Sequence, residues 1–395
     1  MTKHSPAQSG PGRGGSGVSV AGAAETPYTR HAPAGTTTAG LLARAVLTAV
    51  RGAGFGLRDV DGLGVASFTL GHDHAIDLGW RMGLRLGWLM QDTNGGASAG
   101  GLLQHAVRAI QAGDASVIVL VAGDHMDKAA HETLVRSYNS ATADHLTPLP
   151  MSGPNALFAM LTSRQMDQLG LTREDYGRLV VAQRRWAERN PGAVYRDPLT
   201  LEDYLAAPPV ADPLHRYDCV PPVSGANAVV VAADDRWGNT PRARVLSVTA
   251  SYNSDDQLGS GLHTGLVHCA PQAWDRAGVG PADLDVVSCY DDYPAVVLAQ
   301  LRDLGVIPAG ADVPGFLREL AQDRTVPVNT SGGQLSAGQA GAGGGMHGLV
   351  EVVRQLTGEA GQRQVRARLG AVSGYGMVLY RHGACANVTV LEAAA

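Results

Sequence analysis

The chain has 395 residues, about twice the size of a typical single domain, which predicts two domains or two fused halves. Its composition of 45% hydrophobic and 17% charged residues is sufficient for a large buried core. The net charge of −5 gives no electrostatic reason for a nucleic-acid or anionic-membrane partner, so a small molecule or another protein is the expected partner.

The N-terminus and the cysteines bear on location. Residues 1–17 are rich in glycine, serine and proline and lack the apolar core of a signal peptide, so they are predicted to be a disordered leader. No stretch approaches the roughly 20 apolar residues of a membrane span. The four cysteines lie far apart without a C-x-x-C pair, which argues against a zinc knuckle or a disulfide framework. We therefore expect a cytoplasmic protein.

An internal repeat is the main indication of architecture. The run Ala-Gly-Phe-Gly-Leu-Arg-Asp-Val-Asp at residues 53–61 recurs as Ala-Gly-Val-Gly-Pro-Ala-Asp-Leu-Asp at residues 277–285. In each copy a glycine can end the preceding helix in the left-handed conformation, and the Asp-x-Asp pair begins the turn into a strand. The predicted strands are residues 62–67 and 286–289.

A second pair of segments follows at a similar spacing. Glycine-rich loops at residues 94–101 and 329–333 each lead into a helix and then a strand, as a duplicated βαβ unit would. The predicted helix and strand are residues 102–111 and 116–122 after the first loop, and residues 346–356 and 368–373 after the second.

These repeats divide the chain into halves at residues 18–240 and 241–395. The segment at about 124–217 is rich in charge, proline and helix formers such as residues 173–189. We interpret it as an insertion over the face that carries the site.

Two runs of the second half resemble a known family. Asn-Thr-Ser-Gly-Gly-Gln-Leu-Ser at residues 329–336 resembles the N-x-x-G-G-x-x-S loop of thiolases. Tyr-Asp-Asp-Tyr at residues 290–293 resembles the H-D-x-F element of sterol-carrier-type thiolases. The resemblance extends over about residues 18–391, to the lipid-transfer branch of thiolase-like acyl-CoA proteins. It implies an α/β thiolase fold, with duplicated βαβ halves in a five-layer αβαβα sandwich.

The resemblance also implies that catalytic groups have been lost. In thiolases the first glycine-rich loop carries a nucleophilic cysteine, but Ala97 stands at that position here. The histidine of a Gly-His-Pro element is replaced by Gln339, and Ser373 and Gly374 lie where thiolases carry a second catalytic cysteine or a His-Asn pair. Because alanine cannot form a thioester, the usual thiolase reaction is excluded at this residue.

Tyr290 stands at the position of the H-D-x-F histidine. Aldolases of this branch that shorten steroid side chains resemble the chain in lacking the cysteine and using tyrosines for proton transfer. Their second tyrosine is expected where Gln339 stands. In a retro-aldol reaction a base removes the proton of a β-hydroxyl and the thioester leaves as an enolate. The alternative is that Tyr290 and Asp291 form a buried hydrogen-bonded pair ending a strand.

Ser98 lies in a Gly-Ala-Ser-Ala-Gly run, the G-x-S-x-G pattern of a nucleophile elbow, at residues 96–100. A serine nucleophile needs a base, and no acid and histidine follow in the matching order. The alternative is a serine that caps or packs at a helix N-terminus.

Histidines give weaker signals. His125 follows a predicted strand at its carboxyl end, where ligands bind in α/β sheets, so it is a pocket candidate. His72 and His74 point to opposite faces of an extended segment, and we therefore expect no metal site.

We expect a thiolase-like protein that acts on an acyl-CoA thioester, cleaving or forming a carbon–carbon bond without a cysteine nucleophile. The alternatives are a non-catalytic thiolase-fold subunit that scaffolds an acyltransferase complex, and a serine-dependent acyltransferase acting through Ser98. The resemblance implies a small zinc-ribbon and OB-fold partner protein and no cofactor other than the coenzyme A of the substrate. A homodimer through the first-half sheet is expected. The candidate catalytic residues are Tyr290, Asp291, Asn329, Gln339, Ser98 and Ser373, and the candidate substrate-binding residues are Gly96, Ala97, His125, Gly332, Gly333 and Gly374.

Overall fold

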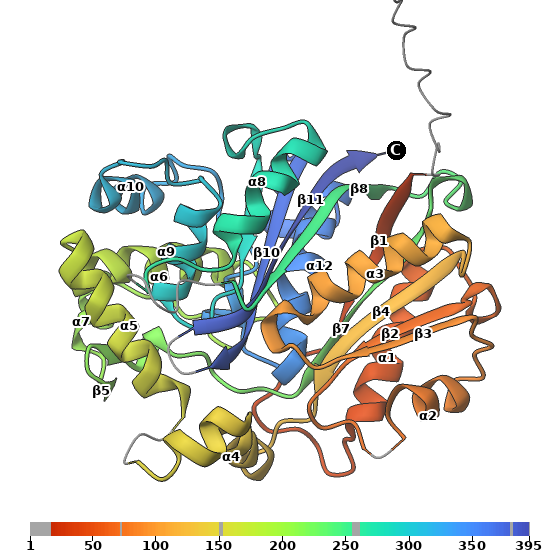
Figure 1. Cartoon of the computed structure of the whole chain (residues 1–395), viewed down its shortest axis with the longest axis horizontal. Coiled ribbons are helices and arrows are strands. Elements are labelled where there is room, and N and C mark those ends of the chain that lie inside the picture. The colour runs from red at the N-terminus through yellow and green to blue at the C-terminus, as the bar shows by residue number, and fades with distance from the viewer. Residues whose placement is uncertain (1–16, 72, 150–152, 255–260, 380–381, 395) are drawn as a thin grey trace, which may run out of the picture.

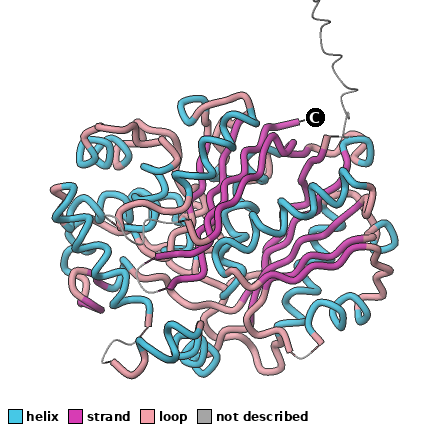
Figure 2. The backbone as a smooth tube through the Cα atoms, viewed as in Figure 1, coloured by secondary structure: helices cyan, strands magenta, loops and turns pink. Residues whose placement is uncertain are grey.

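The computed structural model describes residues 17–71, 73–149, 153–254, 261–379 and 382–394, so residues 1–16 of the predicted leader lie outside the described residues. The main strands form one mixed nine-stranded sheet in the order β3-β2-β4-β7-β1-β8-β11-β10-β9 (Figures 1 and 2). Its strands are β1 (Val18–Glu25), β2 (Gly62–Ala66), β3 (Trp88–Asp92), β4 (Val117–Asp124), β7 (Gly225–Ala233), β8 (Arg242–Tyr252), β9 (Val286–Cys289), β10 (Leu369–Leu379) and β11 (His382–Ala394).

Helices lie between the two parts of this sheet and on their outer faces, so the molecule is layered. The first part, from β3 to β1, is joined to the second by the short pairing of β1 with β8. Two glycine-rich helices, α3 (Ser98–Ala112) and α12 (Gly344–Thr357), pack between the two parts. The outer faces are covered on one side by α1 (Thr38–Gly52) and α2 (His74–Arg81), and on the other by α8 (Leu266–Ala277) and α9 (Pro294–Asp303).

The alternation of side chains along β4 explains the layers. All eight residues of this strand are buried, because one face meets α1 and the other meets the central helices. Val117, Val119 and Val121 belong to the outer core, whereas Ile118 and Leu120 belong to the central core. The predicted five-layer αβαβα sandwich is therefore confirmed.

The repeated runs have the same local structure in both halves. Each forms a 3-10 turn, at Leu57–Asp59 and Pro281–Asp283, in which the turn's own aspartate accepts a hydrogen bond of 2.8 Å from a glycine N–H. The second aspartate of each pair binds the start of the neighbouring parallel strand. Asp61 accepts from the Val117 N–H at 2.8 Å, and Asp285 accepts from the Leu369 N–H at 2.9 Å. The repeat thus fixes equivalent strand pairs.

The segment predicted as an insertion is mainly helical and includes a short π-helical turn, Ala141–Leu146. Every helix in the described part of the chain is too short or too polar to cross a membrane. The remaining elements are α4 (Lys128–Ser137), α5 (Pro154–Leu169), α6 (Arg173–Glu188), α7 (Leu201–Ala206), β5 (Pro209–Ala211), β6 (Leu214–His215), α10 (Val313–Leu320) and α11 (Gly333–Ala337).

Candidate functional site

The main cavity lies where the two glycine-rich loops meet the carboxyl end of β9. Counted with its open mouth, it encloses about 920 Å³. Gly95 and Gly96 line it from the loop before α3, and Gly341 lines it from the loop before α12. Tyr290 and Asp292, which directly follow β9, contribute polar groups to its wall. Both halves of the chain therefore build this one cavity.

A polar cluster of three side chains lies in the cavity wall. The Gln339 Nε2 donates a hydrogen bond of 3.0 Å to the Tyr290 hydroxyl and a second to the Asp292 carboxylate. The Tyr290 hydroxyl and the Asp292 carboxylate therefore share one amide donor. Among the described residues that line the cavity, Asp292 is the only carboxylate.

Burial sets the protonation of this cluster. Desolvation raises the pKa of Tyr290 well above its usual value of 10.0, and the nearby Asp292 charge raises it further. Desolvation also raises the pKa of Asp292 to about 7, although the Tyr290 hydrogen bond acts in the opposite direction. At neutral pH the Tyr290 hydroxyl therefore keeps its proton, while Asp292 can gain or lose one.

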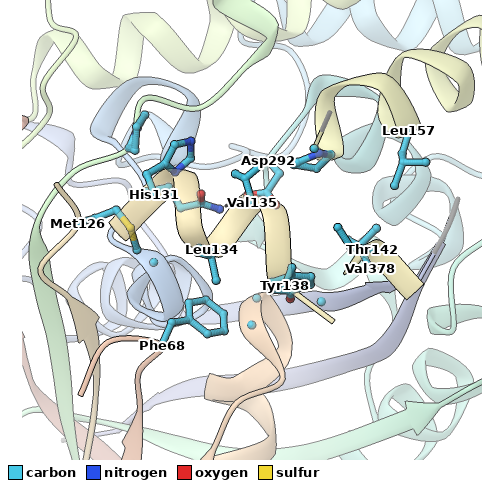
Figure 3. Close-up of a pocket in the computed structure, with 18 of the residues that line it drawn as sticks. Phe68, Met126, His131, Leu134, Val135, Tyr138, Thr142, Leu157, Asp292 and Val378 are labelled. Atoms are coloured by element: carbon cyan, nitrogen blue, oxygen red, sulfur yellow. Dashed lines mark hydrogen bonds between the residues drawn. The ribbon is translucent and has the colours of Figure 1, made fainter. Parts of the chain in front are cut away.

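The roof of the cavity is formed by the segment from α4 to α5. Figure 3 shows Leu134 of α4 and Tyr138, which directly follows that helix, on the cavity side, with Phe68 facing them. The rings of Phe68 and Tyr138 meet edge to face, with centroids 5.9 Å apart. Burial raises the pKa of Tyr138. Further apolar residues of this roof are Val135, Leu146 and Leu157.

Gly96 is required for the close approach of Tyr290. A Cβ at Gly96 would lie 2.3 Å from the Tyr290 ring and 2.2 Å from the Tyr375 carbonyl oxygen. Any larger residue would displace the tyrosine from the wall. Gly96 is thus a lining residue whose lack of a side chain positions Tyr290.

Ala97 and Ser98 do not line the cavity among the described residues. Ala97 is buried, and its carbonyl oxygen accepts a hydrogen bond of 2.6 Å from the Asn387 amide. The fully buried Ser98 hydroxyl donates to Asp92 at 2.7 Å. This contact corresponds to the packing alternative for Ser98 rather than to an exposed nucleophile.

Asp291 points away from the cavity, unlike its neighbour Asp292. Its carboxylate accepts hydrogen bonds from the Gln334 N–H at 2.9 Å and from the Gln183 amide at 2.8 Å, and the Leu335 N–H also donates to it. These groups belong to α11 and α6. Burial raises its pKa to about 6. The structure therefore does not bring Tyr290 and Asp291 together as a hydrogen-bonded pair, and Asp291 instead holds the start of α11.

Asn329, Gly332 and Gly333 shape the loop before α11 and do not line the main cavity among the described residues. The Asn329 side-chain oxygen accepts from the Cys289 N–H at 2.8 Å, which ties the loop to β9. Gly332 and Gly333 have φ values of 92° and 60°, and a Cβ at Gly333 would lie 1.9 Å from Asp291. These contacts maintain the loop in a conformation that places Gln339 in the cavity wall.

The other predicted residues lie outside the lining of the main cavity. Ser373 donates to Gln300 at 2.9 Å, and Gly374 packs against Asn387. His125 contacts Ser224, with 3.1 Å between its Nδ1 and the serine oxygen. His72 lies outside the described residues, and the described residues include no group of three or more His, Cys, Asp or Glu placed to hold a metal ion.

Sequence reasoning missed Asp292 and Tyr138 as cavity residues. Asp292 lies within the Tyr-Asp-Asp-Tyr run, but the resemblance to the H-D-x-F element points to its neighbour Asp291. Tyr138 had no sequence signal, because it reaches the cavity only through the way that α4 folds over the two glycine-rich loops.

Comparisons with known proteins agree with this architecture. A family model described as "Thiolase C-terminal domain-like" matches residues 249–389. A steroid side-chain-cleaving aldolase of Thermomonospora curvata is 30% identical over 369 residues, which cover 86% of this chain and 90% of the relative. A 17-hydroxy-3-oxo-4-pregnene-20-carboxyl-CoA lyase of Mycobacterium tuberculosis is 32% identical over 363 residues, covering 86% and 92%. The chain belongs to the thiolase superfamily.

A sterol carrier protein 2 of Rattus norvegicus is 25% identical over 306 residues, which cover 70% of this chain and 55% of the relative. A solved structure described as "Ltp2-ChsH2(DUF35) aldolase" superposes on this chain with a TM-score of 0.81 at 27% identity. The match covers 95% of this chain and 98% of the solved chain. The family resemblance read from the two second-half runs is thereby confirmed.

Proposed function

We propose that this chain is the thiolase-fold subunit of an aldolase that cleaves the carbon–carbon bond of a β-hydroxyacyl-CoA thioester. The observation that carries the proposal is the placement of Tyr290 and Gln339 in the wall of a cavity that neither Ala97 nor Ser98 reaches. A retro-aldol reaction needs proton transfer and stabilisation of an enolate, but no covalent acyl-enzyme. Two relatives that are at least 30% identical over 86% of this chain are named as an aldolase and a CoA lyase, which supports the same reaction class.

The site can stabilise the charge that develops in this reaction. When the carbon–carbon bond breaks, negative charge moves to the thioester oxygen. The loops that precede α3 and α12 both open onto the cavity, and helix N-termini present N–H groups that favour an anion. We propose that these two loops hold the thioester carbonyl, while the Tyr290 hydroxyl faces the β-hydroxyl of the substrate.

The roof supports a large apolar acyl group. Phe68, Met126 and the apolar side chains of α4 face the polar cluster across the cavity (Figure 3). Apolar walls with a few convergent polar groups are typical of sites that bind a bulky ligand and orient it. A polycyclic acyl-CoA such as the one named for the mycobacterial lyase is therefore a suitable first substrate to test.

We also propose a protein partner and a dimer. The name of the solved aldolase joins it to a DUF35 protein, and this supports a small zinc-ribbon and OB-fold partner for this chain. Strand β3 forms the free end of the first-half sheet, where Leu89 is 39% exposed, and this supports a homodimer through that edge. The four unpaired cysteines are compatible with the proposed cytoplasmic location.

The first test is turnover of 17-hydroxy-3-oxo-4-pregnene-20-carboxyl-CoA and of a simple β-hydroxyacyl-CoA by the full chain, alone and with a DUF35 protein. Tyr290→Phe is expected to lower kcat by about 10² while leaving binding of the CoA ester nearly unchanged, because only proton transfer is removed. Turnover by rapid mixing and ester binding by calorimetry measure the two effects separately.

Tyr204→Phe is the matched control. Tyr204 is also a buried tyrosine hydrogen bonded to an aspartate, Asp218, but it does not line the main cavity among the described residues. Full activity of Tyr290→Phe would remove the proton-transfer role. Equal losses of activity in both variants would indicate a general effect on folding.

A further inference from the structure

The tyrosine that faces the substrate is a poor base by itself. Tyr290 is buried, and its pKa is raised by desolvation first and by the Asp292 charge second. A hydroxyl with a raised pKa keeps its proton at neutral pH, so it can accept a substrate proton only if it passes its own proton on. The proposed reaction therefore requires a proton acceptor behind Tyr290.

Two side chains in the cavity wall are candidates for this acceptor, Asp292 and His131. The Asp292 carboxylate and the Tyr290 hydroxyl accept hydrogen bonds from the same Gln339 amide nitrogen. His131 lies on α4 in the roof, is partly exposed, and has its pKa lowered by burial. Of the two, only Asp292 thus shares a hydrogen-bond donor with the Tyr290 hydroxyl.

We propose that Asp292 is the proton acceptor of the reaction and that it works through the Tyr290 hydroxyl. Gln339 is the side chain that holds the two together. This inference rests on the proposed aldolase function. The β-hydroxyl proton of the substrate passes to the Tyr290 oxygen as the Tyr290 proton passes to the Asp292 carboxylate. The electrons of the O–H bond form the product C=O. The electrons of the broken carbon–carbon bond form the enolate of the thioester.

The second half of the reaction returns the proton. Asp292 gives its proton back to the Tyr290 oxygen while the Tyr290 proton moves to the α-carbon of the enolate. The products are a carbonyl compound and a shortened acyl-CoA, and the proton lost from the hydroxyl is the one gained by the α-carbon. No oxidant, reductant or additional reactant is needed.

The environment of Asp292 suits this role. Burial raises its pKa to about 7, and the neighbouring Asp291 charge acts in the same direction, against the Tyr290 hydrogen bond. A base is most effective when its pKa lies near the working pH. The titratable groups that interact with Asp292 are Asp291, Tyr290 and Tyr293 of the same run, Tyr138 from the end of α4, and Tyr375 from β10.

The pH profile of kcat/KM tests the proposal. The base form of Asp292 exists above a pH of about 7, so the wild type with its partner should lose activity below that pH with a slope of one proton. Asp292→Asn should lower kcat by about 10² or more and abolish this acid limb, with little change in KM. A purely structural role for Asp292 would not remove the limb.

A second variant keeps the test decisive if Asp292→Asn does not fold. Gln339→Met removes the amide that donates a hydrogen bond to the Asp292 carboxylate. In the wild type this hydrogen bond stabilises the charged form of Asp292. Its acid limb should therefore move to higher pH, by about one unit. An unmoved limb in this variant would count against the proposal.

Asp218→Asn is the matched control, since Asp218 is a buried aspartate with a raised pKa that binds the hydroxyl of Tyr204 outside the main cavity. Its profile should equal that of the wild type. An acid limb that persists in Asp292→Asn and disappears in His131→Gln would overturn the role of Asp292 while leaving the aldolase function intact. Absence of turnover by the wild type with both CoA esters would instead overturn the aldolase function, and the role of Asp292 with it.

Discussion

At the residue scale, the start of α3 carries the G-x-S-x-G pattern of a nucleophile elbow, but its serine is buried and hydrogen bonded. Ser98 stands one residue after the position of the thiolase cysteine and is buried against Asp92. Asp92 also accepts a hydrogen bond of 2.6 Å from the Asn94 N–H. The serine and the aspartate therefore hold the loop that places Gly95 and Gly96 in the cavity wall.

Acylation is the measurement that separates these roles. After incubation with acyl-CoA, mass spectrometry should find no acyl group on Ser98, and iodoacetamide should not modify residue 97, where alanine stands. Ser98→Ala should lower the free energy of unfolding by about 1–2 kcal/mol, because Asp92 loses a buried hydrogen-bond donor. An adduct that forms on Ser98 and disappears in the variant would favour the serine acyltransferase.

At the element scale, a buried charge network joins the first strand to a central helix. Glu25 of β1 contacts His347 at 3.1 Å and Arg354 at 3.0 Å, both on α12. The His347 Nε2 lies 2.7 Å from the Ser331 hydroxyl in the loop before α11. Three elements from the two halves are therefore held together by one group of side chains.

The pKa shifts in this network predict how stability depends on pH. Burial would raise the pKa of Glu25, but His347 and Arg354 lower it to about 2 from 4.5. This stabilisation is present above pH 4.5 and is lost as the pH falls towards 2. Burial would lower the pKa of His347, but Glu25 raises it above 6.5, so this stabilisation is complete below 6.5 and is lost as the pH rises through the raised value.

Glu25→Gln should therefore destabilise the protein by about 3–5 kcal/mol, because it leaves buried cationic groups without their partner. It should also flatten the acid side of the stability curve measured by urea unfolding. Glu319→Gln, which removes an exposed pair with Arg324, is the control and should change stability by less than about 1 kcal/mol. An unchanged acid slope in Glu25→Gln would contradict this account.

At the scale of the whole molecule, the two ends of the sheet differ. The second-half end, β9, is short and buried, and isolated pairing with Val328 covers part of it. The first-half end, β3, alternates between half-buried and exposed side chains before the buried Asp92, and the adjoining α2 exposes Ile76 and Trp80. An edge strand with exposed apolar neighbours is prone to pair with another chain.

We therefore predict that the protein is a dimer by light scattering at micromolar concentration, and that Leu89→Lys shifts it towards the monomer by placing a charge on the edge. Met160→Lys, at an exposed apolar residue of α5, is the control and should remain dimeric. A monomeric wild type in the absence of any partner would contradict the prediction.

The sequence by itself determined the duplication and the loss of the cysteine, because both depend on local patterns. The Asp-x-Asp turns are short-range structures, and the glycine-rich loops begin helices in both halves, so the duplication could be predicted from residues 53–61 and 277–285. The thiolase fold was implied by the resemblance of residues 290–293 and 329–336. Ala97 could be identified from its place in a single loop. The boundary at residue 240 stays a prediction, since β8 begins only at Arg242.

Only the tertiary structure decided which polar groups meet in the cavity. Asp291 and Asp292 are adjacent in the chain, but one binds the start of α11 and the other faces the cavity, and this depends on how the strand ends beneath that helix. Tyr138 reaches the same cavity from a helix more than a hundred residues away in sequence. Side-chain direction at the end of a strand and the packing of a distant helix are set by long-range contacts, and no local pattern encodes them.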